Sequence, residues 1–295
     1  MEIAKLGKRS KRKRNKIGLV LLTPYLVLTM VFWCIPFVWS FILSLQKWNM
    51  MSSAKFIGLE NFKKIFSDKL FYITIRNTFQ FIGVFIPLCV AIALLVAWMI
   101  YKLQRASSFF LISFLLPYVT AGVAYAVIFN RLFAYDGVVN VALRTIHMHI
   151  PFFTDPKIAM SSIALLAVWK IMGYYTLIFY AGLQAIPQSI YDAALIDGAT
   201  DKQTFFKITI PMLNASLVTI LIFAIGLSVN IFTEPYLITG GGPFFSTHTF
   251  VFWTYKTTFE LFQAGKGSAL AIITSVISFG LVFIVRKFVE REVSV

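Results

Sequence analysis

Long apolar runs separated by short polar stretches dominate the pattern of this chain. Six of the runs are long enough to cross a membrane, since a helix of about 20 residues spans a hydrocarbon core about 30 Å thick. Lipid offers no hydrogen-bond partner to backbone amides, so each run must form a helix or a closed barrel strand. The runs lack the alternation of barrel strands, which favours helices. The predicted spans are residues 17–45, 72–100, 107–131, 158–182, 213–239 and 267–286.

One polar stretch, residues 184–211, separates the fourth predicted span from the fifth, and we call it the polar loop. Pro187 can open a helix there, with Ser189 as its expected N-cap. Ala193 and Ala194 follow, and their small side chains would let another protein pack closely.

The polar loop also carries signals for a second helix. Gly198 is expected to end the first helix. Thr200 and Gln203 have the spacing of a capping box. Pro211 is expected to end the second helix as the next apolar run begins. The pattern therefore predicts a helix–turn–helix that lies on the membrane face.

The composition excludes a soluble protein. Hydrophobic residues make up 59% of the chain and charged residues only 13%, with a mean hydropathy of +0.80. A soluble domain does not need so much apolar material for its core. We therefore expect an all-α integral membrane protein.

The distribution of positive charge predicts the orientation. Residues 1–16 form a tail with eight Lys or Arg against the single acid Glu2. Such a tail stays in the cytoplasm, and six spans then place both ends there (N-in/C-in). Residues 46–71 hold five lysines on the outer side and argue against this orientation, but a dense basic flank on the first helix usually dominates. This orientation places the polar loop in the cytoplasm.

The net charge of +15 also raises the possibility of a nucleic-acid partner. Beside an apolar span, the basic tail is better interpreted as a topology anchor that is attracted to anionic membrane lipid. We therefore expect lipid contact and no nucleic acid.

Few residues in the sequence suggest a metal site, a nucleotide site or a catalytic site. Cys34 and Cys89 fall within predicted spans, where cysteine usually behaves as a small apolar residue. His147 and His149 could ligate a metal, but no third ligand is near them in the sequence. No catalytic constellation stands out, and the string around Lys266 lacks the leading Gly and the following Ser/Thr of a Walker A motif. We expect a chain without a metal, cofactor or enzymatic activity of its own.

The polar loop resembles the EAA loop of binding-protein-dependent ABC importer permeases. That loop reads Glu-Ala-Ala, three residues, Gly, nine residues and Ile-x-Leu-Pro. This chain keeps both spacings, with Asp192 for Glu and Ile210 for Leu. In the family the loop is the coupling helix that docks on a cytoplasmic ATPase. The resemblance implies that the coupling residues are Asp192, Ala193, Ala194, Asp197, Gly198, Ala199 and Phe205.

A second segment is similar to the Thr-Gly-Gly-Gly-Pro segment of carbohydrate-importer permeases of the maltodextrin and multiple-sugar type. It implies that the chain faces an extracytoplasmic binding protein with Thr239, Gly240, Gly241, Gly242 and Pro243. Further matches are Thr23-Pro24, Gly58-Leu59-Glu60-Asn61-Phe62, Asn77-Thr78 and Ser268-Ala269-Leu270-Ala271, so the resemblance covers nearly the whole chain.

In this family a sugar crosses through a cavity between two permeases. Polar groups inside spans are costly and tend to face such a cavity, although they also join helices by hydrogen bonds. The candidate substrate-pathway residues are Trp169, Lys170 and Tyr174 in the fourth span and Ser228, Asn230 and Glu234 in the fifth.

The resemblance implies the type I importer permease fold, with a six-helix domain over 17–289 and a cytoplasmic tail over 290–295. It implies a subunit of the bacterial cytoplasmic membrane that imports a sugar or oligosaccharide by alternating access. The implied partners are a second homologous permease, a sugar-binding protein and a dimer of ABC ATPase subunits, which would hold the ATP and Mg.

Three alternatives stay open. An ion-driven secondary transporter could use Lys170 and Glu234, although no inverted repeat is evident. A membrane enzyme would need a catalytic constellation. An importer of amino acids or peptides would share the EAA loop, but the Thr-Gly-Gly-Gly-Pro segment favours carbohydrate.

Overall fold

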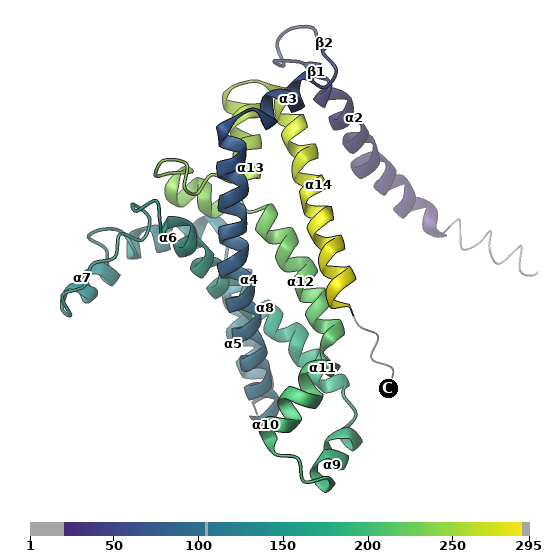
Figure 1. The fold of residues 1–295 in the computed structure, drawn as a ribbon, viewed down its shortest axis with the longest axis vertical. Helices are drawn as coiled ribbons and strands as arrows, with labels where there is room; N and C mark the ends of the chain where they lie inside the picture. Colours follow the sequence, from purple (N-terminus) through teal and green to yellow (C-terminus); the bar gives the residue numbers. More distant parts are fainter. Residues whose placement is uncertain (1–20, 104–105, 291–295) are drawn as a thin grey trace, which may run out of the picture.

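Helices make up nearly all of the architecture in the part of the chain that the computed structural model describes, residues 21–103 and 106–290 (Figure 1). The predicted tail over 1–16 lies outside these residues, as does the predicted tail over 290–295 except for its first residue. Helix α2 (Ile35–Ser44) is the last part of the N-terminal helix Leu21–Ser44. The α-helices that follow are α3 (Glu60–Phe66), α4 (Lys69–Leu103), α5 (Ser107–Val119), α6 (Gly122–Leu132), α7 (Val138–Arg144), α8 (Ala159–Ala185), α9 (Gln188–Ile196), α10 (Asp201–Thr204), α11 (Ile210–Met212), α12 (Asn214–Val229), α13 (Phe250–Tyr255) and α14 (Ala264–Val289). Single π-helical turns cover Met30–Cys34, Phe205–Thr209, Pro235–Thr239 and Lys256–Glu260, and β1 (Gln46–Lys47) pairs antiparallel with β2 (Lys55–Phe56).

Among the described residues, four helices are long and apolar enough to cross a membrane: Leu21–Ser44, α4, α8 and α14. Two bent pairs qualify as well, α5 with α6 and Asp201–Met212 with α12. Counting each pair as one span gives up to six crossings.

The predicted span over 107–131 is divided into two helices in the structure. The axes of α5 and α6 differ by 88°. Thr120 and Ala121 both have ψ near 130° (135° and 128°), so the helical conformation stops between the two elements. Pro117 lies in the last turn of α5, just before the break. Its backbone nitrogen carries no hydrogen and cannot donate a helical hydrogen bond.

The fifth predicted span also differs from the structure, because α12 ends at Val229 rather than at residue 239. Asn230 leaves the helical conformation with ψ 12°. Pro235 then starts a separate π-helical turn, which Gly240 ends in the left-handed conformation at φ 58°. Polar residues Asn230 and Glu234 lie at this break, between apolar segments.

The core forms where α4 and α8 lie side by side. Cys89, Ala93 and Ala97 of α4 are fully buried, as is Ala164 of α8. Small residues of this kind let the backbones of two membrane helices approach closely. The Thr176 hydroxyl bridges the pair, donating to the Ala93 carbonyl at 3.4 Å and to its own helix at 2.8 Å.

Helix α8 also packs against α5, and at Gly173 the two backbones are too close to leave space for a side chain. A Cβ at Gly173 would overlap the carbonyl oxygen of Phe114. Beside this point the rings of Tyr118 and Tyr174 stack at 4.7 Å, with only 10° between their planes. The close approach of α5 and α8 therefore depends on glycine at position 173.

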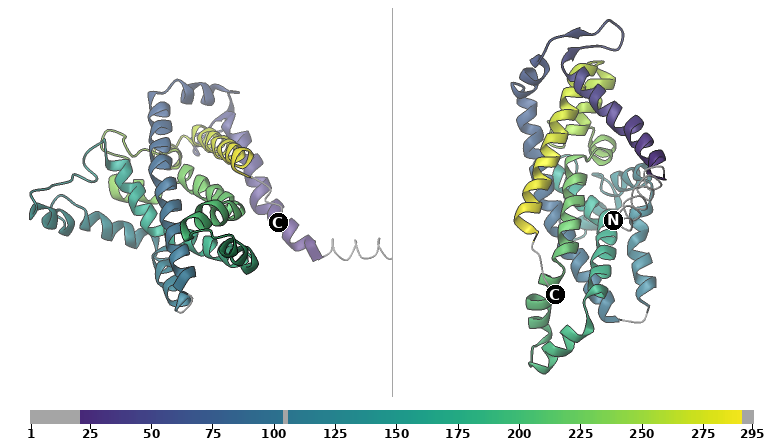
Figure 2. Two further views of the ribbon diagram at one scale, coloured as in Figure 1. Left: turned by 60° about the horizontal axis from the view of Figure 1, so that its bottom comes forward. Right: turned by 90° about the vertical axis from the view of Figure 1, so that its right-hand side faces the viewer.

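The helices place distant segments at two opposite ends of the molecule (Figures 1 and 2). At one end, Lys102 at the end of α4 lies 3.7 Å from Asp201 of α10, and the Asn214 amide donates to the Val289 carbonyl at the end of α14. At the other end, Lys266 at the start of α14 lies 3.8 Å from Asp68, just before α4. The polar loop and the β-hairpin therefore occupy opposite ends.

The N-terminal helix Leu21–Ser44 leans away from the bundle like an arm (Figures 1 and 2). None of its most apolar 18-residue window is buried. Its Ser44 end is held, because the Asn61 amide donates to the carbonyls of Ser44 and Gln46 at 2.9 Å each. This arm is attached to the bundle at one end only.

Candidate functional site

Two helices joined by a tight turn form the polar loop, as predicted. The first, α9, ends in a Schellman motif: the Ala199 amide donates to the Ala194 carbonyl and the Gly198 amide to the Leu195 carbonyl. Gly198 adopts φ +74°, which glycine tolerates best. The expected N-cap is wrong, because α9 begins at Gln188 directly after Pro187, and Ser189 lies inside its first turn.

The second helix begins with the predicted capping box. The Gln203 amide donates to the Thr200 hydroxyl at 3.3 Å, and the Gln203 side chain accepts from the Thr200 amide at 2.8 Å. The helical stretch Asp201–Met212 ends one residue after Pro211, and the chain then bends by 63° at Leu213, close to where Pro211 was expected to end the helix. Pro211 lies just after the π-helical turn Phe205–Thr209.

The side chains of α9 point in three directions. Ile190 and Ala194 pack inward, and Ala194 is only 5% exposed. Ala193 is exposed, together with Ile196 at 86%. Of the two alanines, only Ala193 is therefore accessible to another protein. We call Ser189, Ala193 and Ile196 the outer face of α9.

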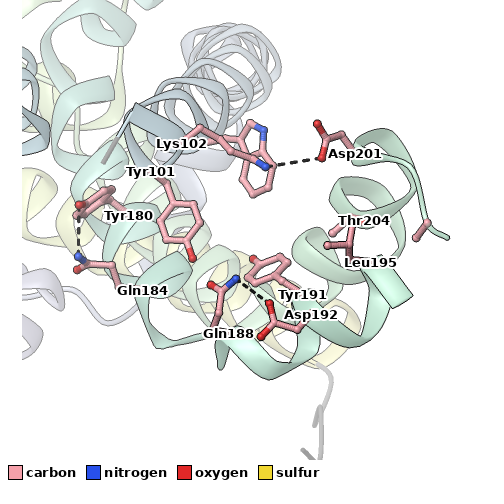
Figure 3. A pocket seen from close by; sticks show the side chains of 12 residues that line it. Tyr101, Lys102, Tyr180, Gln184, Gln188, Tyr191, Asp192, Leu195, Asp201 and Thr204 are labelled. Carbon is pink, nitrogen blue, oxygen red and sulfur yellow. Dashed lines mark hydrogen bonds and ion pairs between the residues drawn. The ribbon is translucent and has the colours of Figure 1, made fainter. Parts of the chain in front are cut away.

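The third direction leads to a groove between the polar loop and the ends of α4 and α8, with a volume of about 460 Å³ (Figure 3). Helix α9 turns its Asp192 carboxylate toward this groove, where it accepts from the Gln188 amide at 3.3 Å. We call Gln188, Tyr191, Asp192 and Leu195 the groove face of α9.

The polar loop exposes apolar side chains that the family pattern did not single out. Leu195 and Phe206 are 75% and 65% exposed, in addition to Ile196. Large exposed apolar side chains can contribute to an interaction surface. The signal was visible in the sequence, since these residues interrupt an otherwise polar segment. Asp197 lies at the end of α9 and is exposed.

Phe205 has a different position from its exposed neighbour. Its ring lies 5.0 Å from that of Trp98 on α4. It therefore connects the second helix of the polar loop to the end of a membrane helix.

The Thr-Gly-Gly-Gly-Pro segment forms a compact turn beside α13. Gly240 and Gly241 have φ of 58° and 81°, and a Cβ at Gly241 would overlap the Phe252 ring. The Thr239 and Thr247 hydroxyls lie 2.6 Å apart, and Thr247 donates to the Gly242 carbonyl at 2.8 Å. The Gly242–Pro243 peptide is cis. Gly242 and Pro243 also line an open pocket of about 420 Å³.

This turn is tied to α4 by a buried amide. The Asn77 side chain donates to the Phe245 carbonyl at 2.7 Å and to the His248 carbonyl at 3.0 Å. Asn77 is 4% exposed, so water cannot replace either bond.

Replacing Asn77 by alanine is expected to destabilise the protein by about 2 kcal/mol, because two buried carbonyls lose their donor. Thermal unfolding of the purified chain in detergent measures this loss. Asn130→Ala is the control, since the Asn130 amide makes one long bond of 3.5 Å. Equal unfolding temperatures for the two variants would contradict the role of Asn77.

His248 packs beside this anchor and lies outside the candidate spans. Its ring is 2% exposed and contacts the Thr74 hydroxyl at 3.3 Å. Burial, helped by the positive charge of Lys256, lowers the pKa of His248 from 6.5 to about 4.

The stability of the protein should therefore depend on pH below neutrality. Above about pH 6.5 His248 is neutral in both the folded and the unfolded chain, and its contribution is fully present. As the pH falls toward about 4, only the unfolded chain takes up a proton, which costs about 3 kcal/mol of stability. Unfolding temperature measured against pH tests this. His248→Gln should flatten the dependence, and an unchanged slope would contradict it.

The structure does not gather the six predicted pathway residues at one site. Lys170 and Glu234 meet at Tyr125: the Tyr125 hydroxyl bonds the Glu234 carboxylate, and the Lys170 Nζ lies 4.2 Å from the ring centre. Tyr174 stacks on Tyr118. Trp169 is 38% exposed in an aromatic cavity of about 300 Å³.

The remaining two pathway residues bond to their own helix. The Ser228 hydroxyl donates to the Ala224 carbonyl at 2.6 Å, and the Asn230 amide donates to the Gly226 carbonyl at 2.8 Å. Ser228 is buried, whereas Asn230 is exposed at the end of α12. Asn230 is therefore the better placed of the two to meet a substrate.

His147 and His149 were the candidate metal ligands in the sequence. Across the described residues, no three His, Cys, Asp or Glu side chains converge in a way that could hold an ion. His149 instead lies 4.3 Å from the Tyr135 ring.

Comparison with known proteins identifies the family of this chain. Residues 15–294 match the family described as binding-protein-dependent transport system inner membrane component. The probable ABC transporter permease YesP of Bacillus subtilis is 33% identical over 91% of this chain and 89% of its own. The lactose transport system permease LacF of Rhizobium radiobacter is 32% identical over 96% of each chain.

Solved structures share the fold. A chain of a bacterial alginate ABC transporter, crystallised with an alginate-bound periplasmic protein, superposes with a TM-score of 0.80 at 20% identity over 94% of this chain and 95% of its own. A chain of a second alginate importer structure gives a TM-score of 0.81 at 20% identity over 97% and 99%. The protein therefore belongs to the inner-membrane components of binding-protein-dependent transport systems, as a multi-pass protein of the bacterial cytoplasmic membrane.

Proposed function

We propose that this chain is the permease subunit of an ATP-driven, binding-protein-dependent importer of a sugar or oligosaccharide. The observation that carries the proposal is the position of its two motif segments. The polar loop lies at one end of the helices and the Thr-Gly-Gly-Gly-Pro turn toward the other (Figure 1). One chain can thus meet a binding protein outside and an ATPase inside.

The relatives support a carbohydrate substrate. Their names include permeases for lactose, for sulfoquinovosyl glycerol and for sn-glycerol-3-phosphate. All three substrates are small and rich in hydroxyl groups. We infer that this chain carries a polyhydroxylated substrate as well, along Trp169, Lys170, Tyr174, Asn230 and Glu234, with Ser228 in a packing role.

We propose six membrane crossings with both chain ends inside. The bent pair of α5 and α6 counts as the third crossing and α12 as the fifth. The basic tail over 1–16 supports this orientation, since positive segments stay in the cytoplasm. The polar loop then faces the cytoplasm, as coupling requires.

A second, homologous permease is proposed as the occupant of the space beside the arm. Helix Leu21–Ser44 extends from the bundle with its apolar side chains uncovered. One permease forms only half of a translocation pathway, so a second permease must supply the other half. The extended arm can cover the lipid-facing side of that second permease.

We propose that the outer face of α9, with Phe206, docks on an ABC ATPase. ATP and Mg are proposed to bind that partner, and the string of this chain nearest to a Walker A motif, around Lys266, lacks the leading Gly and the Ser/Thr after Lys. A binding protein with its sugar is proposed to face Thr239, Gly240, Gly241, Gly242 and Pro243.

Purification of the tagged chain from its native membrane tests the proposal. A second permease and an ATPase with a Walker A motif should accompany it, and proteoliposomes of the complex should take up sugar when ATP is supplied. Isolation of the chain alone, with uptake driven by a sodium or proton gradient, would favour the secondary transporter. Uptake of amino acids but not of sugars would overturn the substrate class.

A further inference from the structure

The groove behind α9 combines side chains in a way that the coupling role does not explain (Figure 3). Four aromatic residues line it, two from α4, one from α8 and one from α9. Polar side chains alternate with these rings. The lining consists of Trp98, Tyr101, Lys102, Tyr180, Gln184, Gln188, Tyr191, Asp192, Leu195, Ala199, Asp201 and Thr204.

Three of the rings are neighbours in the groove. Trp98 and Tyr101 lie 6.1 Å apart with 24° between their planes, and Tyr101 and Tyr191 lie 6.5 Å apart at 40°. Flat apolar faces of this kind suit a ligand with apolar C–H faces, such as a sugar ring.

Amide and carboxylate groups face the same space. Gln184 and Gln188 offer planar amides that both donate and accept, and Asp192 offers acceptors. Their present bonds are long, at 3.3 Å from Gln184 to the Tyr180 hydroxyl and 3.3 Å from Gln188 to Asp192. Hydroxyl groups of a ligand could replace these bonds without leaving a buried group unpaired.

The charge of the groove excludes an anionic ligand such as a phosphate. Asp192 and Asp201 line it, and Lys102 is its single cation among the lining residues. Lys102 already lies 3.7 Å from Asp201 and 5.0 Å from the centre of the Trp98 ring. A neutral polyhydroxylated ligand fits the remaining carboxylate and amides.

The volume sets the size of this ligand. A cavity of about 460 Å³ lies within the range for small-molecule sites, about 300–1,000 Å³. This space holds one or two linked sugar rings.

The groove and the outer face of α9 are different surfaces. Residues spaced three or four apart share one side of a helix. Gln188, Tyr191, Asp192 and Leu195 therefore face the groove, whereas Ser189, Ala193 and Ile196 face away from it. A small molecule can thus occupy the groove while a protein covers the outer face.

We propose that this groove is a regulatory site for a neutral mono- or disaccharide on the cytoplasmic side, where an imported sugar accumulates. The inference rests on the proposed function for its orientation and for the source of the sugar. The ligand touches α4 and α8 on one wall and α9 and α10 on the other. It therefore fixes the coupling loop against the membrane helices, and transport slows as its product accumulates.

Thiol labelling of two exposed positions tests the site directly. Leu195→Cys places a thiol at the rim of the groove, and Lys287→Cys places one at the exposed end of α14, outside the groove lining, both in a Cys34→Ser background. The full complex in inside-out vesicles is labelled with a water-soluble maleimide in the presence of glucose, galactose, lactose, maltose or choline. A site with a Kd of about 1 mM is about nine-tenths occupied at about 10 mM sugar, so labelling of the Leu195→Cys variant should slow about tenfold.

At least one of the four sugars should protect position 195 and leave position 287 unchanged. Tyr101→Leu and Gln184→Ala should abolish this protection. Gln184 is exposed, so its variant keeps the fold. Protection by choline alone, protection of both positions, or no protection by any of the four sugars would overturn the inference.

Uptake separates this inference from the proposed function. The protecting sugar, at about 10 mM on the cytoplasmic side, should reduce ATP-driven uptake about threefold or more, and Gln184→Ala should relieve the reduction. If ATP-driven sugar uptake occurs but Gln184→Ala does not relieve the inhibition, only the regulatory role of the groove is overturned. Absence of ATP-driven sugar uptake overturns the proposed function itself, whatever the labelling shows.

Discussion

Gly173→Ala is expected to lower the stability of the protein by about 2 kcal/mol and to reduce uptake about tenfold or more. The added methyl group would overlap the Phe114 carbonyl, which belongs to the backbone of α5 and cannot rotate away. Helices α5 and α8 must then separate, and the stacked pair of Tyr118 and Tyr174 separates with them. Thermal unfolding and an uptake assay on the same preparation measure both effects.

Gly226→Ala is the matched control. Gly226 lies within α12 and has no atom within 4 Å of the position of an added Cβ. This substitution should raise stability by up to about 1 kcal/mol, because alanine favours a helix over glycine. If both variants unfold at the same temperature, the close approach of α5 and α8 is not the reason for glycine at position 173.

Ile196→Glu is expected to release the ATPase from the complex. The side chain of Ile196 is 86% exposed on the outer face of α9, and the proposed interface would bury it. A carboxylate without a partner in such an interface costs about 3 kcal/mol, which weakens binding by about a hundredfold. Co-purification of the ATPase with the tagged permease measures the loss.

Ile196→Leu is the companion variant, and it should retain the ATPase because its side chain keeps the same volume and polarity. The amount of permease in the membrane should be equal for both variants, since position 196 makes no core contact. Full retention of the ATPase by Ile196→Glu would exclude the outer face as the docking surface.

The parts of the fold that depend on neighbours in the sequence were predictable. The capping box at Thr200 and Gln203 and the left-handed turn at Gly198 follow from side chains within one helical turn. The positive φ of Gly240 and Gly241 has the same local origin. Their bond partners lie within a few residues, so spacing alone identifies them.

Breaks within apolar segments were not predictable from hydropathy. Thr120 interrupts a helix in a stretch that remains apolar on both sides, and Asn230 interrupts one close to Glu234. Hydropathy reports the transfer of side chains into lipid, whereas these breaks depend on backbone conformation and on contacts with other helices. Pro117 and Pro235 were the local signals closest to the breaks.

The two faces of α9 and the groove also depend on the tertiary structure. Ala194 is buried although its neighbour Ala193 is exposed, because α9 packs its inner side against the bundle. Trp98 and Tyr101 join the groove from almost a hundred residues away in the chain. No spacing rule links residues at that separation.

The arm formed by Leu21–Ser44 has a consequence for the biogenesis of the complex. A helix that is apolar on every side is as stable among lipid chains as against another protein. The arm can thus remain in the bilayer after the bundle has folded, held at Ser44 by the Asn61 amide. The proposed second permease can then join the finished subunit at any later time without refolding, so the proposed pair need not be synthesised together.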